Sequence, residues 1–385
     1  MNDNNCNLMG VSEEHEALRT QVRRFVEREV IPYAEAWERD GQMPRSVIRR
    51  MGELGMLGLR FSSQYGGADA DTIASVVFAE ELGRSTFGGF AITILTQTDT
   101  ASPPLAAVGT PEQKERFLPA IVRGDCVVAI AMTEPDVGSD IGALQMRAAR
   151  DGESWVLDGA KTFVTNGVNA DLYVVAARTD SSVKPSQGVS LFLVEKGTQG
   201  LRVERRLEKM GWRSSDTAQL SFDACRVPAS ALLGERNRGF AALMKNVQNE
   251  RLVLAAQAIG ESQAAIALTL NYVRLRKAFG ATLWDKQAIR QRLAMLAARV
   301  ESARYFLYGV AGLDARGVNC VKEVSMIKAL CGELANEVVD DCVQFHGGSG
   351  YMNGTPIERM YRDARVHAIG GGATEVMLEE VAKRM

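Results

Sequence analysis

The sequence predicts an α+β protein in which two helical regions flank a central region of β-strands. Apolar residues recur at helical spacing before residue 125, short β-rich runs fill the middle, and long helical patterns return from about Gly239. We therefore expect an N-terminal helical domain over 1–125, a β domain over 126–236 and a helical bundle over 237–385. A chain of 385 residues is long enough for two or three domains.

Helix signals organise the first domain. Ser12 stands before Glu13 and Glu14, and acidic residues favour the positive end of a helix dipole. Pro32 is expected to end or bend that helix. Later signals are a helix over Thr72–Leu82 and helix entries at Pro103–Pro104 and Thr110–Pro111.

The middle and last regions differ in their periodicity. Ala218, Leu220 and Phe222 alternate with polar residues, as in a half-buried strand, and several such short runs predict a small sandwich or barrel. The last region has three apolar helix faces, and helices of this length that pack together make a bundle. Cys331 and Cys342 fall on the third face and are expected to be small buried hydrophobes.

Composition and charge exclude several classes of protein. The 45 basic and 47 acidic residues leave a net charge of −2, which disfavours a general nucleic-acid binder. No uninterrupted apolar run approaches ~18 residues, so we expect no membrane insertion. Residues 1–5 are polar and carry no targeting pattern, which favours a cytoplasmic location. The six cysteines and three histidines lack ligand spacing, so no metal site is expected.

Five segments in one order resemble the acyl-CoA dehydrogenase family, and the resemblance runs almost end to end. It implies an N-terminal helical domain, a middle β domain and a C-terminal four-helix bundle, with FAD held between the last two domains. It also implies an acyl-CoA substrate, a homo-oligomer that is commonly a tetramer, and electron transfer to an electron-transfer flavoprotein. The segments are Met132–Asp140, Lys161–Gly167, Lys209–Arg213, Arg276–Gly280 and Gln344–Tyr351.

The resemblance assigns the first cofactor contacts. Met132 and Thr133 match residues at the flavin edge, and Ser139 matches a residue that meets the cofactor pyrophosphate or CoA. Phe163 and Thr165 match the pair that packs against and hydrogen-bonds the isoalloxazine, although many relatives have Trp where this chain has Phe163. Taken alone, the first motif is more typical of a surface turn than of a cofactor site, and Phe163 is equally typical of ordinary strand packing.

Further contacts are implied near the C-terminal helices. Arg276 matches an arginine that reaches the FAD pyrophosphate of an adjoining subunit, and a guanidinium suits this because it grips phosphate oxygens in pairs. The alternative is a solvated surface cation. The other residues that match cofactor contacts are Phe279, Gln287, Gln344, Gly347, Gly348, Ala373 and Glu375.

The catalytic acid is the main departure from the commonest family pattern. Many relatives carry a catalytic glutamate where this chain has Gly371, in the loop that precedes a helix expected over Glu375–Arg384 with Thr374 as its N-cap. The isovaleryl-CoA and long-chain branch places the acid at the start of an earlier helix, where this chain has Glu250 followed by Arg251, a predicted substrate contact. The alternative is that Glu250 only complements the dipole of a first helical turn.

The implied reaction is α,β-desaturation of an acyl-CoA thioester. Glu250 would remove the α-proton while hydride passes to flavin N5. Gly371 would contact the substrate, and its backbone N–H would stabilise the developing enolate oxygen. An apolar site is expected to raise the pKa of Glu250 toward neutrality.

Alternatives remain open at the level of sequence. The same fold supports an acyl-CoA oxidase or a flavin monooxygenase, and a non-catalytic flavoprotein scaffold or a nucleic-acid-associated relative is a third class. The absence of a long C-terminal extension favours a dehydrogenase over an oxidase. The placement of the acid favours branched-chain or medium- to long-chain substrates only by association. Chain length and branching cannot be read from the sequence.

Overall fold

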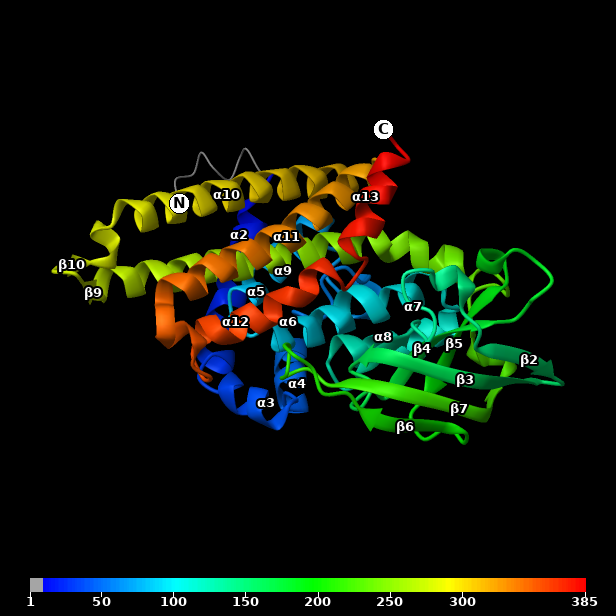
Figure 1. Ribbon diagram of the computed structural model, residues 1–385. Helices are drawn as coiled ribbons and strands as arrows, with labels where there is room; N and C mark the ends of the chain where they lie inside the picture. The colour runs from blue at the N-terminus through cyan, green and yellow to red at the C-terminus, as the bar shows by residue number, and fades with distance from the viewer. Residues whose placement is uncertain (1–9) are drawn as a thin grey trace.

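The computed structural model describes residues 10–385 (Figure 1). Long helices lie side by side across the molecule, the sheet occupies the lower right of the view, and the helices of the N-terminal third pack beneath the long ones. The predicted order of helices, strands and helices is confirmed. The polar N-terminal residues 1–5 and Cys6 lie outside the described residues.

Side-chain caps start two helices of the N-terminal domain where the sequence predicts them. The Ser12 hydroxyl accepts a hydrogen bond from the His15 N–H, and the Thr110 hydroxyl accepts one from the Gln113 N–H. The π-helical turn η1 ends at Val30, two residues before Pro32. The elements are α2 (Glu13–Phe25), η1 (Val26–Val30), α3 (Ala34–Asp40), α4 (Arg45–Glu53), η2 (Ser63–Tyr65), α5 (Thr72–Gly83), α6 (Gly88–Leu95), η3 (Thr96–Ala101), α7 (Pro103–Val108) and α8 (Pro111–Val122).

The middle region is an eight-stranded sheet in the order β6-β7-β3-β2-β4-β5-β8, with β1 paired in parallel to β4. Strands β4 and β5 are buried on both faces. One face packs on an inner core that includes Trp155 and Phe192, and the other contacts a core shared with α7 and α8. The strands are β1 (Val128–Ala131), β2 (Arg147–Asp151), β3 (Ser154–Thr165), β4 (Leu172–Arg178), β5 (Val189–Glu195), β6 (Leu201–Arg206), β7 (Thr217–Pro228) and β8 (Leu232–Leu233), with short turns η4 (Ile141–Ala143), η5 (Pro185–Gln187) and η6 (Ala229–Ala231).

The C-terminal region is built on three long helices, and Cys331 and Cys342 are buried among them as predicted. A hairpin joins the first two helices, and α13 packs against α11. The elements are α9 (Gly239–Leu275), β9 (Lys277–Ala278), β10 (Ala281–Thr282), η7 (Leu283–Asp285), α10 (Gln287–Ala315), α11 (Val321–His346), η8 (Gly347–Tyr351), α12 (Pro356–Ala364), η9 (Arg365–Ala368) and α13 (Thr374–Ala382).

Helix α9 is the central element that links the helical domains. Two glycines let α5 and α9 approach closely, because a Cβ at Gly83 would collide with the Gln257 carbonyl oxygen and one at Gly260 with the Glu80 carbonyl oxygen. By length and composition, with a mean hydropathy of 1.3 over its most apolar window, α9 could cross a membrane. Because 78% of that window is buried inside the structure, α9 has the burial of a core helix.

Candidate active site

Glu250 lies well inside α9 and not at its start. The helix begins at Gly239, so Glu250 is its twelfth residue. The chain packs closely on β5 at this helix start, because a Cβ on Gly239 would lie only 2.7 Å from the Ser190 carbonyl carbon. The predicted position at a helix start was therefore wrong. The alternative in which Glu250 only complements the dipole of a first turn no longer applies.

The Glu250 carboxylate makes no hydrogen bond to any residue in the range 10–385. Burial raises the pKa of Glu250 to about 7, the direction expected from the sequence. The positive charges of Arg251 and Lys328 oppose this rise, and the carboxyl group of Asp99 adds to it. Glu250 is thus an unbonded acid that can change its protonation state near neutral pH.

Gly371 and Glu250 face the same small space. A Cβ built on Gly371 would lie 3.8 Å from Glu250 Oε1 and would collide with the Leu254 Cδ1 methyl. The residue has a φ of +67°, a conformation that favours glycine. Within the described residues the Gly371 N–H has no acceptor, so it is free to bind a ligand.

Helix α13 begins one residue earlier than predicted, at Thr374, and ends at Ala382. Thr374 is not its N-cap. Ala373 takes that position, and no side chain caps the helix, while the buried Thr374 hydroxyl donates to the Ala368 carbonyl oxygen at 3.5 Å. The uncapped first turn, with Ala373 partly buried and Glu375 exposed, follows directly on the glycine loop.

A buried ion pair fixes the first and second motifs against each other. The Thr162 N–H donates to the Thr133 carbonyl oxygen at 2.9 Å. Lys161 Nζ donates to the Met132 carbonyl oxygen at 2.9 Å and to Glu134 Oε1 at 2.8 Å, and Lys161 is fully buried. Met132 and Thr133 therefore lie next to the strand that carries Phe163.

Phe163 does not pack as an ordinary strand residue. It is 70% exposed and has a φ of +56° at an irregularity of β3 between Lys161 and Val164, so the strand-packing alternative was wrong. Thr165, two residues further on, is partly exposed, and Ser139 is exposed on the loop of the first motif. An exposed ring beside a partly exposed hydroxyl can bind a flat, partly polar ligand.

A second group of predicted cofactor residues lies at the other end of α9. Arg276 is exposed and forms no ion pair with any residue between 10 and 385. Phe279 is 98% exposed at the tip of the β9–β10 hairpin, which Figure 1 shows at the end of the bundle away from the sheet. Gln287, the first residue of α10, is also exposed. At a rise of 1.5 Å per residue, the 26 positions from Glu250 to Arg276 correspond to about 39 Å.

The end of α11 lies against the same part of α9. The Tyr272 hydroxyl donates to the His346 carbonyl oxygen at 3.1 Å, and the two rings stack with centroids 4.3 Å apart. Gly347 and Gly348 follow, and a Cβ at either position would meet nothing within 4 Å. Together with exposed Gln344, they form an open surface for a ligand or a second chain.

The structure also identifies polar residues near Glu250 that the sequence reasoning missed. Asp99 is buried in η3, and its Oδ1 accepts a hydrogen bond from Asn249 Nδ2 at 2.8 Å. Burial raises the pKa of Asp99. Lys328 is only 2% exposed on α11. In the sequence, Lys328 could be noticed only because it lies four residues after Val324, as a charged residue on an otherwise apolar helix face.

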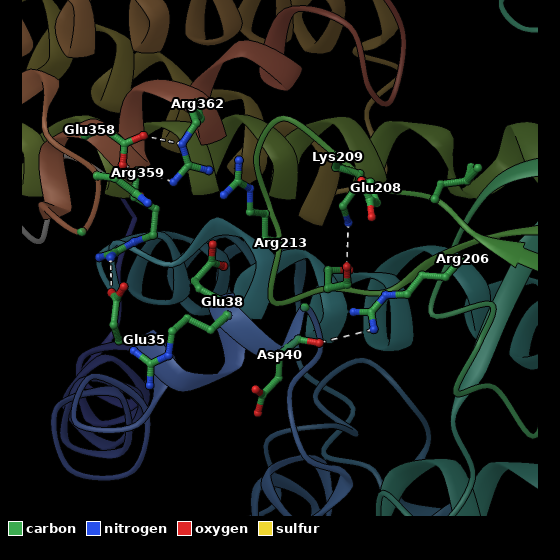
Figure 2. A pocket seen from close by; sticks show the side chains of 16 residues that line it. Glu35, Glu38, Asp40, Arg206, Glu208, Lys209, Arg213, Glu358, Arg359 and Arg362 are labelled. Atoms are coloured by element: carbon green, nitrogen blue, oxygen red, sulfur yellow. Dashed lines mark hydrogen bonds and ion pairs between the residues drawn. The ribbon is translucent and has the colours of Figure 1, made fainter.

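A cavity of about 770 Å³ opens elsewhere, between α3, the segment from Arg206 to Ser215, and α12 (Figure 2). Acidic and basic side chains both line the cavity. Two ion pairs lie in its wall, Glu35–Arg359 at 2.7 Å and Glu358–Arg362 at 2.5 Å. No predicted site residue lines it. Because binding sites for apolar ligands are lined mainly by apolar side chains, this charged crevice is a poor acyl site.

Comparisons with known proteins cover nearly the whole chain. Three family models match, the acyl-CoA dehydrogenase N-terminal domain over residues 12–125, the middle domain over 129–225 and the C-terminal domain over 237–385. The mitochondrial long-chain specific acyl-CoA dehydrogenase of Rattus norvegicus is 41% identical, across 97% of this chain and 87% of the relative.

Solved structures agree with these matches. An acyl-CoA dehydrogenase from Geobacillus kaustophilus superposes with a TM-score of 0.93 at 41% identity, covering 97% of this chain and 98% of the other. A glutaryl-CoA dehydrogenase from Mycobacterium smegmatis in complex with FADH2 superposes with a TM-score of 0.91 at 26% identity, covering 97% and 95%. The chain belongs to the acyl-CoA dehydrogenase family. The predicted three-part fold is confirmed, and the protein is a flavin-dependent acyl-CoA dehydrogenase.

Proposed function

We propose that Glu250 is the base that removes the α-proton of an acyl-CoA thioester. The observation that carries this proposal is the placement of an unbonded carboxylate, with a pKa of about 7, 3.8 Å from the Cβ position of Gly371. A base whose pKa lies near the working pH is half ionised there and still basic enough to accept a proton.

Other acids near this space are poor candidates. At position 371 the Leu254 methyl fills the room that a side chain would need. Asp99 is buried, and both of its carboxylate oxygens accept hydrogen bonds, one from Asn249 Nδ2 at 2.8 Å and one from the Thr98 hydroxyl at 2.6 Å. Glu250 is therefore the acid with free lone pairs.

The Gly371 N–H supplies the complementary charge stabilisation. An α-proton is weakly acidic, so its removal needs a donor aimed at the thioester oxygen, where negative charge develops. The unbonded Gly371 N–H precedes the uncapped first turn of α13, whose N–H groups add a positive dipole end. The proton then moves from the α-carbon to a Glu250 oxygen while the thioester oxygen is held by the backbone.

The exposed and partly exposed residues of the first two motifs fit FAD. Exposed Phe163 offers a flat apolar surface, and Thr165 and the backbone of Met132 and Thr133 offer hydrogen-bonding groups along one edge. When bound, FAD supplies an acceptor for the hydrogen that leaves the β-carbon as hydride. We propose Ser139 for the pyrophosphate or CoA, Ala373 and Glu375 for the adenine side, and Arg251 for the substrate.

A second chain would complete the cofactor site. About 39 Å of helix separates Glu250 from Arg276, a distance that argues against one FAD contacting both in a single chain. We therefore propose a homo-oligomer, specifically a tetramer, in which the FAD of one subunit is contacted by residues of a neighbouring subunit, namely Arg276, Phe279, Gln287, Gln344, Gly347 and Gly348. The electron acceptor that we propose is an electron-transfer flavoprotein.

The glycine loop indicates a wide substrate site beside the base. A Cβ on Gly370 would make only ordinary contacts with Val366, at 3.6 Å, so a side chain would be tolerated there and its absence leaves space. We propose that this space admits a methyl branch on a medium- or long-chain acyl group.

The test is anaerobic flavin bleaching by a panel of straight and 3-methyl-branched acyl-CoAs. We expect branched substrates to react within about tenfold of straight ones, whereas a pocket with no room for the extra methyl group would discriminate against them by ~10–200-fold. Bleaching by no member of the panel contradicts the proposal. Reoxidation by electron-transfer flavoprotein is expected to exceed peroxide formation in air, and the reverse result supports an oxidase.

A further inference from the structure

Helix α11 grips the segment that carries Gly371 through three residues spaced one turn apart. Lys328 Nζ donates to the His367 carbonyl oxygen at 2.9 Å and also to the Gly372 carbonyl oxygen. Four residues on, a Cβ at Gly332 would lie 2.6 Å from the same His367 oxygen, so the backbones approach closely. Another four residues on, Asn336 Nδ2 donates to the Ala364 carbonyl oxygen at 3.0 Å.

The same segment is tied to α9 on its other side. His367 Nε2 lies 2.7 Å from Glu261 Oε2, and both side chains are buried. Glu261 lies three turns beyond Glu250 on the same helix. The backbone between Ala364 and Gly372 is thus held between the helix of the proposed base and α11.

We propose that Lys328 is a positioning residue that sets the loop of Gly371 against Glu250. Within residues 10–385, the Lys328 side chain makes the one hydrogen bond from α11 to the glycine loop, at the residue after Gly371. Its two acceptors are carbonyl oxygens, so an ammonium group satisfies both while its charge stays near Glu250. This inference rests on the proposed function of Glu250.

The charge of Lys328 acts together with other groups that face Glu250. Arg251 comes from α9 and Asp99 from η3, and Glu380 of α13 and Arg384, two residues after the end of α13, act on Arg251 in turn. Lys328 and Arg251 favour the ionised form of Glu250, and Asp99 disfavours it. Removing the Lys328 charge would leave Glu250 protonated to a higher pH.

The test uses the FAD-loaded enzyme and an acyl-CoA whose β-carbon is replaced by sulfur. This analogue can lose its α-proton but cannot lose a β-hydrogen, so exchange of the α-proton in deuterated water isolates proton abstraction. In Lys328→Met we expect exchange at pH 7 to fall by about 10- to 100-fold, because a misplacement of about 1 Å costs on the order of 10²-fold. We also expect the pH of half-maximal exchange to rise, which a purely structural defect would not cause.

Two further variants make the result decisive. Lys322→Met removes a lysine from the first turn of α11, away from the loop, and is expected to match the parent enzyme. Asn336→Ala keeps the Lys328 charge and releases one end of the segment, so exchange should slow by a few-fold, within the limit set by loss of one hydrogen bond, at an unchanged pH midpoint.

The inference is overturned if Lys328→Met retains FAD and exchanges at the parent rate with the parent pH midpoint. Should Lys328→Met fail to fold, Lys328→Gln takes its place, and exchange at the parent rate with the parent pH midpoint in that variant overturns the inference instead. The proposed function is judged separately by Glu250→Gln in the same assay. Exchange retained in Glu250→Gln refutes Glu250 as the base, whereas exchange lost there but unchanged in Lys328→Met refutes only the role of Lys328.

Discussion

The two ends of helix α9 carry two different kinds of site. Around Glu250, charged groups are buried, and the facing loop is tied to α11 and α9 by hydrogen bonds. Around Arg276, the side chains are exposed, and Phe279 protrudes almost fully into solvent. A carboxylate without a hydrogen bond, such as Glu250, and an exposed aromatic ring, such as Phe279, both lower the stability of a single chain without ligand or partner.

This difference separates what one chain can build from what it leaves open. The Glu250 site has its acid, its donor and their supports in a single chain. At the Arg276 end, the side chains of Arg276, Phe279 and Gln287 are exposed, and a Cβ at Gly347 or Gly348 would meet nothing within 4 Å. The comparison predicts that changes at the first end alter chemistry, whereas changes at the second alter cofactor retention and assembly.

The largest effect is expected from Glu250→Gln. A positioned base contributes ~10²–10⁴ in rate, so flavin bleaching by acyl-CoA should slow by that range while the yellow FAD stays bound. Rapid-mixing absorbance measurements test this. Bleaching at the parent rate would show that another group removes the proton.

The same variant has a built-in control for folding. Because burial raises the pKa of Glu250 from its ordinary value of 4.5 to about 7, the ionised carboxylate is disfavoured in the folded state, and the resulting cost to stability grows between these two pH values and is complete above about 7. Glu250→Gln removes that cost, so its thermal midpoint at pH 8 should equal or exceed that of the parent enzyme.

An intermediate effect is expected from Arg276→Gln. Charge-assisted hydrogen bonds contribute about 1.5–3 kcal/mol, which corresponds to an FAD dissociation constant raised roughly 10- to 100-fold. FAD titration of the apoprotein measures this, with Lys277→Gln on the same hairpin as the control. Equal losses in the two variants would indicate general charge and not a specific phosphate contact.

The smallest effect is the dependence on pH. Glu250 must be ionised to act as a base, and its raised pKa of about 7 places half-ionisation near neutrality. The bleaching rate should therefore rise by about tenfold per pH unit below that value and level off above it. This rise of the bleaching rate with pH should be absent in Glu250→Gln. A rise that persists in the variant would show that another group titrates in this range.

The sequence predicted the architecture better than the detail of the site. Apolar periodicity and caps such as Ser12 and Thr110 depend on neighbours along the chain, and the structure confirms them. Glu250 was wrongly expected at a helix start, although the helical pattern returns from about Gly239; no proline or glycine separates the two residues, and α9 runs through both without a break. The domain boundaries, the roles of the site residues and the cellular location stay predictions.

The supporting residues were out of reach for a similar reason. Lys328 acts on carbonyl oxygens about forty positions away, and Asp99 meets Asn249 across 150 positions, so no local pattern marks either pair. Phe163 was assigned to a flavin wall by resemblance, but its outward orientation depends on an irregularity in the pairing of β3 with β7. Such geometry comes from tertiary structure and leaves only weak signals in a single sequence.

The close contact between α5 and α9 depends on two residues that have no Cβ atom. Gly83 and Gly260 each leave out the methyl group that would strike a carbonyl oxygen of the opposite helix. An alanine at either position would push α9 away from α5 and move Glu250 away from the bound thioester. Neither glycine is among the residues proposed to contact substrate or cofactor. Such a substitution would lower the measured activity as the loss of a catalytic residue does, although its cause would be the displacement of a helix.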